Sequence, residues 1–118
     1  MKEELLKLAL RVEALSGPER HVDADIAEAL GWHQYSGANW IGPLGQIAVP
    51  SYTVSLDAAM TLVPKGWAWS VLDRRTTGYS KPNGQCWTKE DRSTLHGDAA
   101  TPALALCAAA LRALAKEE

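Results

Sequence analysis

The chain has no phenylalanine, although it has five tryptophans and three tyrosines. Every large aromatic side chain therefore carries a hydrogen-bonding group, which excludes an aromatic core free of polar atoms. Two interpretations of the aromatic residues remain open. The rings lie at the boundary between sheet and helices with one end in water, or they form a surface that stacks a ligand or contacts a partner.

Cysteine is also scarce, since the chain has only Cys86 and Cys107. Two cysteines are too few for a disulfide-stapled scaffold, and the N-terminal residues lack the apolar run of a secretory signal. No apolar run reaches the roughly 18 residues of a membrane span, because Arg112 interrupts the alanine- and leucine-rich residues 103–115. We therefore expect a cytoplasmic protein with free thiols and no membrane partner.

Positive charge is not in excess, because 12 Lys and Arg residues against 14 Asp and Glu residues give a net charge of −2. The chain thus lacks the electrostatic footprint of a protein that binds bulk nucleic acid. Its 118 residues, 47% of them hydrophobic, are enough for one domain with its own core. We expect a single domain that covers residues 1–118.

Helical periodicity is clearest near the two ends of the chain. Residues 2–16 carry apolar side chains at the spacing of a helix with one buried face. Residues 102–115 form the second such pattern, with Thr101 as the N-cap and Pro102 in the first turn. The side chains expected in the core are those of Leu8, Val12, Leu104 and Leu111.

Two shorter helices are predicted in the interior of the sequence. Asp23 is expected to cap a helix over residues 23–30, which ends at Gly31. Ser55 is expected to cap a helix over residues 56–63, which ends at a proline. Helical structure therefore accounts for about four segments of the chain.

Strand signals lie between these helices. Residues 67–72 have no clearly polar face, so we expect this strand to be covered on both sides. Residues 97–100 are expected to be a joint within the domain. The predicted strands, which we expect in one mixed or antiparallel sheet, cover residues 32–35, 39–41, 67–72 and 85–89. The fold class is α/β (α+β), a single α-β-α layered sandwich with a small, mainly antiparallel sheet.

Four segments in series resemble the phage ABA sandwich domain, a family of small proteins encoded by bacteriophages and prophages. The segments are residues 26–32 (IAEALGW), 52–59 (YTVSLDAA), 62–67 (LVPKGW) and 100–111 (ATPALALCAAAL). The resemblance implies an α-β-α layered domain, a phage origin and expression in the host bacterial cytoplasm. It implies no reaction and no catalytic residues, and residues 76–95 have no recognisable family pattern.

Residues that could carry chemistry do not form a catalytic or metal-binding set. Cys107 lies on the apolar stripe of the last helix, and no local pattern ties Cys86 to a histidine. The three histidines are scattered, and the nearest approach to a metal-ligand set is His96 with Asp98 two residues later. We therefore expect no enzyme activity, no cofactor and no metal site.

One stretch has the composition of an anion-binding surface. Residues 73–81 hold three cations, several hydroxyls and a tyrosine, although the chain as a whole is acidic. Arginine can hold a phosphate with two hydrogen bonds while an aromatic ring stacks a base. A solvated turn is the competing interpretation. The candidate ligand-binding residues, drawn from this stretch and from the tryptophan-rich region before it, are Trp32, Tyr35, Trp40, Arg74, Arg75, Tyr79 and Lys81.

These features favour a non-enzymatic phage accessory protein that acts by binding. The expected partner is a small anionic ligand such as a nucleotide, or a host defence protein, and binding would antagonise a bacterial defence. A role in phage structure or morphogenesis is the alternative, with the alanine-rich residues 104–114 packing against a second copy to form a homo-oligomer. A small hydrolase is the third hypothesis.

Overall fold

The computed structural model describes residues 2–36, 39–46, 48–73, 81–88 and 94–117. Its helices are α1 (Lys2–Ala14), α2 (Arg20–Ala29), α3 (Leu56–Met60) and α4 (Pro102–Glu117). Its strands are β1 (His33–Ser36), β2 (Asn39–Ile41), β3 (Ala68–Leu72), β4 (Asn83–Trp87) and β5 (Thr94–Asp98). The fold is a small α+β sandwich with antiparallel sheets, as expected from the sequence.

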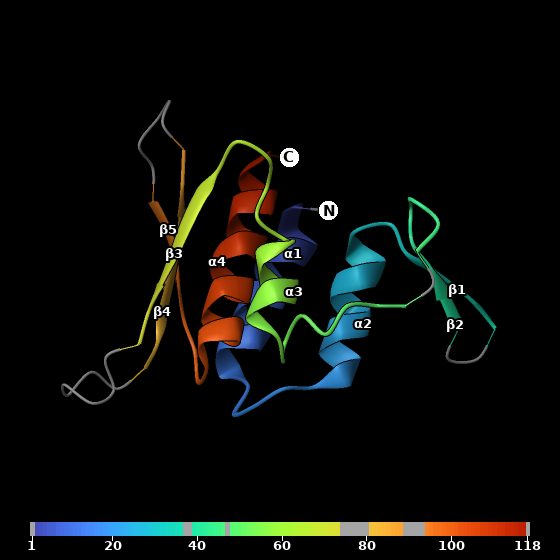
Figure 1. Cartoon of the computed structure of the whole chain (residues 1–118), viewed down its shortest axis with the longest axis horizontal. Coiled ribbons are helices and arrows are strands. Elements are labelled where there is room, and N and C mark those ends of the chain that lie inside the picture. The colour runs from blue at the N-terminus through green and yellow to red at the C-terminus, as the bar shows by residue number, and fades with distance from the viewer. Residues whose placement is uncertain (1, 37–38, 47, 74–80, 89–93, 118) are drawn as a thin grey trace.

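The layers follow one another along the longest axis of the molecule (Figure 1). A three-stranded sheet with the order β3-β4-β5 lies at one end, and α4 packs directly against it. Helices α1 and α3 pack against α4, and α1 also contacts α2. The β1-β2 hairpin lies at the opposite end, beyond α2 (Figure 1).

Helix α4 is the centre of the core. The hydroxyl of Thr101 accepts a hydrogen bond from the backbone N–H of Leu104 at 3.2 Å, which caps the helix as its sequence predicts. Almost every residue from Ala103 to Ala115 is buried, so this helix is surrounded by its own chain. The four leucine and valine side chains expected in the core are all buried. The hypothesis that the alanine-rich helix packs against a second copy is therefore wrong, because no face of it remains for a partner.

Two glycines let the sheet lie very close to this helix. A Cβ atom on Gly84 or on Gly97 would lie only 2.5 Å from the carbonyl oxygen of Ala105, closer than real Cβ contacts. Both the sheet and the helix therefore use small residues where they meet, and this close approach explains the many alanines of α4.

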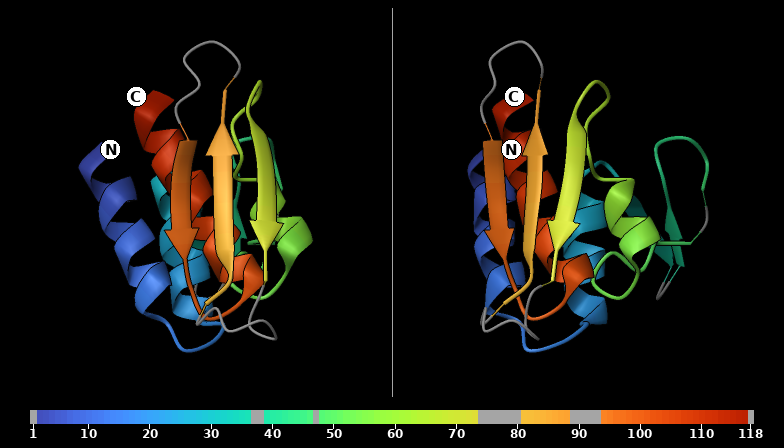
Figure 2. Two further views of the ribbon diagram at one scale, coloured as in Figure 1. Left: turned by 90° about the vertical axis from the view of Figure 1, so that its left-hand side faces the viewer. Right: turned by 60° about the vertical axis from the view of Figure 1, so that its left-hand side comes forward.

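Three details of the predicted sheet are wrong. The strands belong to two separate sheets rather than one, with β1 and β2 apart from β3, β4 and β5. Residues 97–98 are not part of a joint but end β5, a strand that the sequence pattern did not reveal. Residues 68–72 are not covered on both sides, because both ends of β3 are exposed and the middle is only half-buried. Figure 2 shows the helices behind the sheet and its front face open.

Candidate functional site

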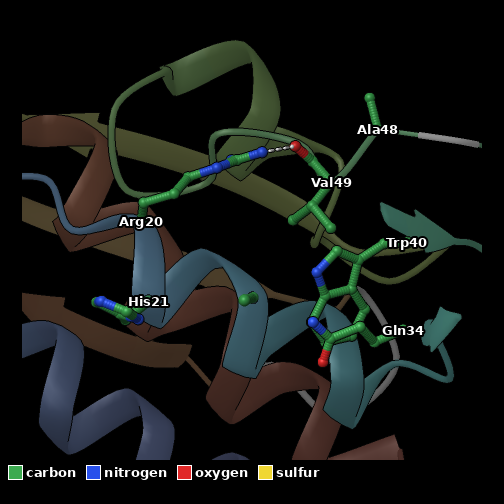
Figure 3. A pocket seen from close by; sticks show the side chains of 7 residues that line it. Arg20, His21, Gln34, Trp40, Ala48 and Val49 are labelled. Carbon is green, nitrogen blue, oxygen red and sulfur yellow. Dashed lines mark hydrogen bonds between the residues drawn. The ribbon is translucent and has the colours of Figure 1, made fainter. Parts of the chain in front are cut away.

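A cavity lies between α2 and the β1-β2 hairpin (Figure 3). It has a volume of about 640 Å³, which is within the range of about 300–1,000 Å³ typical of small-molecule sites. Three separate parts of the chain form its walls, namely helix α2, the hairpin and the segment that follows the hairpin. The lining residues are Arg20, His21, Ala24, Gln34, Trp40, Ala48 and Val49.

Arg20 holds one wall of this cavity in place. Its Nη2 donates to the carbonyl oxygen of Val49 at 2.8 Å, the bond drawn in Figure 3. Its Nη1 donates to the carbonyl oxygen of Pro50 at 3.2 Å and to Oδ2 of Asp23 at 3.2 Å. One guanidinium therefore ties the first turn of α2 to a segment 30 residues further along the chain.

Asp23 supports Arg20 from inside the protein. The side chain of Asp23 is fully buried, and its Oδ1 accepts a hydrogen bond from the backbone N–H of Thr53 at 2.8 Å. Thr53 in turn caps α2, because its Oγ1 accepts from the N–H of Glu19 at 3.0 Å. The prediction that Asp23 is the N-cap of a helix starting at residue 23 is therefore wrong. The helix starts at Arg20, and a hydroxyl from a distant loop satisfies the backbone donor.

Trp40 provides the aromatic surface of the cavity. It comes from β2, is half-buried against the core, and lies across the cavity from His21 in Figure 3. Gln34, its cross-strand partner on β1, lines the same cavity. An indole face beside a guanidinium and an imidazole can stack a planar ring and attract an anionic group.

The predicted binding residues do not all lie near this cavity. Of those that the structure describes, Trp40 lines it, whereas Trp32 is only 5% exposed and is part of the core. Lys81 is exposed and precedes β4 by two residues, and β4 lies at the end of the molecule opposite to the hairpin that carries Trp40 (Figure 1). Tyr35 belongs to β1, but its side chain lies outside the described part of the structure. Arg74, Arg75 and Tyr79 lie outside the described residues.

Sequence reasoning missed Arg20 and His21. It placed the start of the second helix at residue 23, so both residues seemed to belong to a loop. Once the helix is known to begin at Arg20, His21 and Ala24 lie three residues apart on one helical face, the spacing that places side chains side by side. The correct start of the helix would have pointed to both residues, but that start depends on the hydrogen bond from the backbone of Glu19 to the distant Thr53.

A second charged cluster lies where α1, α4 and β5 meet. Glu13 and Arg112 form an ion pair in which Nη2 of Arg112 lies 2.6 Å from Oε1 of Glu13. The hydrogen bond from Arg112 and the N–H of Asp98 lower the pKa of the Glu13 carboxyl, while burial opposes them. The charge of nearby Lys81 lowers it further. This cluster joins three elements, and neither Glu13 nor Arg112 lines the cavity beside Trp40.

A smaller cavity of about 300 Å³ lies between α1 and α2. It contains an exposed ion pair in which Nη1 of Arg11 lies 2.7 Å from Oδ2 of Asp25. Most of the side chains that line it are charged, and none is aromatic. The cavity beside Trp40 is therefore the better candidate for an organic ligand.

The two cysteines are free, as expected, and both are buried. Burial raises the pKa of Cys86 to about 11. Burial and then the nearby charge of Asp23 raise the pKa of Cys107, whose Sγ donates to the carbonyl oxygen of Tyr52 at 3.1 Å. Because a thiolate is the reactive form of cysteine, neither residue is poised as a nucleophile at neutral pH.

Other features of the described residues give no further candidate site. No group of three or more His, Cys, Asp or Glu side chains within them converges so as to hold a metal ion. Within the same residues, no helix has both the length and the apolar character needed to cross a membrane. Comparisons with protein-family models, with curated proteins and with solved structures found no match to this chain.

Proposed function

We propose that this protein is a non-enzymatic binding protein whose cavity between α2 and the hairpin takes a small anionic ligand with a planar ring, such as a nucleotide. The observation that carries this proposal is the position of Trp40 and Arg20 on the same cavity of about 640 Å³. Nucleotide-sized molecules fit a cavity of this volume.

Each side chain of the cavity is proposed to contact a different part of the ligand. The indole of Trp40 offers a stacking surface, which contributes about 1–3 kcal/mol per base in proteins that bind single-stranded nucleic acid. Arg20 supplies a positive charge, and hydrogen bonds to two backbone carbonyls fix its position before a ligand arrives. His21 adds ring nitrogens that can form hydrogen bonds with a ligand. A preorganised cation costs less ordering entropy on binding than a mobile one.

The setting follows from the sequence resemblance to phage ABA sandwich domains. In an infected bacterium, a protein that sequesters a nucleotide-like signal would antagonise a defence that depends on that signal. The buried, protonated thiols of Cys86 and Cys107 support a binding role over thiol catalysis.

Calorimetry against a panel of mono-, di- and cyclic nucleotides tests the proposal. We expect at least one of these compounds to bind, and Trp40→Ala to weaken that binding about tenfold or more because a stacking contact is lost. Trp40→Phe should restore most of the affinity, since phenylalanine also stacks.

A matched pair of histidine variants tests whether the loss of binding is specific to residues that line the cavity. His21→Ala removes a lining residue, whereas His33→Ala changes an exposed histidine on β1 that does not line the cavity. Only the first should weaken binding. If no compound in the panel binds, or if Trp40→Ala binds as tightly as the unchanged protein, the proposed ligand site is wrong.

A further inference from the structure

The β5 edge of the three-stranded sheet is closed by side chains. Nη1 of Arg112 donates to the carbonyl oxygen of His96 at 2.7 Å, and Oε2 of Glu13 accepts from the N–H of Asp98 at 3.0 Å. These two backbone groups are the ones that a neighbouring strand would bind. The Glu13–Arg112 ion pair therefore occupies the place of a further strand at this edge.

The closed edge shows which backbone groups face outward across the whole sheet. In an antiparallel sheet, the N–H and C=O of one residue point to the same side, and the side alternates along the strand. Because His96 and Asp98 face away from β4, Leu95 and Gly97 bond to it. The register of the sheet then makes Ala68, Ser70 and Leu72 the residues of β3 that bond to β4. The residues of β3 whose backbone groups face away from the sheet are Trp69 and Val71.

Within the described residues, the β3 edge has no such closure. The N–H and C=O groups of Trp69 and Val71 have no hydrogen-bond partner among the described residues. Proteins protect exposed edges with charged side chains, prolines, bulges or covering segments. Strand β3 has the sequence AWSVL, without charge or proline, and pairs with β4 in an unbroken register.

We propose that a second copy of this chain binds at this edge, with β3 of one subunit antiparallel to β3 of its partner about a twofold axis at Ser70. Trp69 then lies opposite Val71 of the partner subunit, and each such pair exchanges two hydrogen bonds. The two three-stranded sheets become one six-stranded sheet, a common size in globular proteins, where the mean is about 5–6 strands.

The side chains of β3 complement themselves in this register, and this favours a second copy over an unrelated strand. On the helix-facing side, Trp69 meets a valine, an aromatic and β-branched pair that stabilises sheets. On the open side, Leu72, which is 42% exposed, meets the small Ala68 of the partner subunit. At the axis, two Ser70 side chains face each other in a non-hydrogen-bonded pair, where Cα atoms are only about 4.5 Å apart, and the small serine side chains fit this close spacing.

This interface is independent of the proposed ligand cavity, because the hairpin and the three-stranded sheet lie at opposite ends of the molecule (Figure 1). Loss of the dimer therefore should not change ligand binding. Failure of the ligand experiment leaves the dimer experiment intact, and the reverse also holds.

Sedimentation equilibrium of the full chain over a wide concentration range tests the proposal. We expect the mass to rise to twice that of the monomer. Ser70→Lys should raise the dimer Kd about fivefold or more, because it places two like charges opposite each other. Ser70→Glu should act in the same way, and an equimolar mixture of the two variants should dimerise again. This rescue excludes misfolding as the cause of the loss.

A proline variant tests the backbone directly. The N–H of Val71 faces away from β4, so Val71→Pro removes an outward donor while it keeps the hydrogen bonds to β4. We expect it to raise the Kd about tenfold or more, whereas Val71→Ala, which keeps the N–H, should have a smaller effect. A monomer at every concentration overturns the proposal, and so does a dimer that neither Ser70→Lys nor Val71→Pro weakens. A monomer would leave this edge to an extended segment of a different protein.

Discussion

The carboxylate of Glu13 and the guanidinium of Arg112 meet in a two-pronged ion pair, although 99 residues separate them in the sequence. The two contacts measure 2.8 Å and 2.6 Å, and both side chains are mostly buried. Because the same two groups also bind the backbone of β5, this pair joins α1, α4 and the sheet. It stabilises the fold and closes one sheet edge at the same time.

The pH dependence of stability should reflect this ion pair. The pKa of Glu13 is lowered from its ordinary value of 4.5 in the folded protein. Because the pKa of Glu13 is lower in the folded protein, its ionised carboxylate stabilises the fold fully above pH 4.5. This stabilisation is lost as the pH falls through the lowered pKa of the folded protein. Glu13→Gln should therefore destabilise the protein by about 1–3 kcal/mol at pH 7.

Urea unfolding at pH 7 and at pH 3 measures this effect. The difference between Glu13→Gln and the unchanged protein should shrink strongly at the lower pH, because the carboxyl is then increasingly protonated. Glu28→Gln removes the same charge from an exposed position on α2 and serves as the control. An equal difference at both pH values would show that the charge of Glu13 does not contribute.

The close approach of the sheet to α4 predicts which glycines cannot be replaced. A Cβ on Gly84 would lie within 2.5–2.7 Å of backbone atoms of Ala105 and Leu106, and backbone cannot move aside as a side chain can. Gly84→Ala should cost about 1–3 kcal/mol or more in urea unfolding. Gly17→Ala is the control, because no atom lies within 4 Å of its added Cβ. An unchanged unfolding midpoint for Gly84→Ala would contradict the packing described.

The buried carboxylate of Asp23 should contribute more to the free energy of unfolding than the exposed carboxylate of Asp25. Asp23→Asn can still accept from the N–H of Thr53, but it loses the charge that holds Arg20. We expect a loss of about 1.5–3 kcal/mol, typical of hydrogen bonds to charged groups. Asp25→Asn breaks only the exposed pair with Arg11 and should cost about 0–1 kcal/mol. Chemical unfolding of both variants compares them, and equal costs would mean that Arg20 is not held by Asp23.

Local signals in the sequence determined the terminal helices and most of the core. The cap at Thr101, the proline after it and the apolar spacing of α1 and α4 act over a few residues, so they can be found without a structure. The same holds for Ser55, whose side chain accepts from the N–H of Ala58 as a cap should. The buried position of Cys107 also follows from its place on the apolar stripe of the last helix.

Only the tertiary structure decided β5, the start of α2 and the position of the cavity. Strand β5 has little hydrophobic alternation because a glycine is needed at position 97, where α4 lies against the strand. The packing that stabilises this strand therefore leaves no alternating pattern in its sequence. Helix α2 begins at Arg20 because Thr53, from a loop more than 30 residues away, satisfies its first backbone donor. The separation of Lys81 from Trp40 likewise depends on the positions of the two sheets on opposite sides of the helices, and contacts between distant segments leave no local pattern to find.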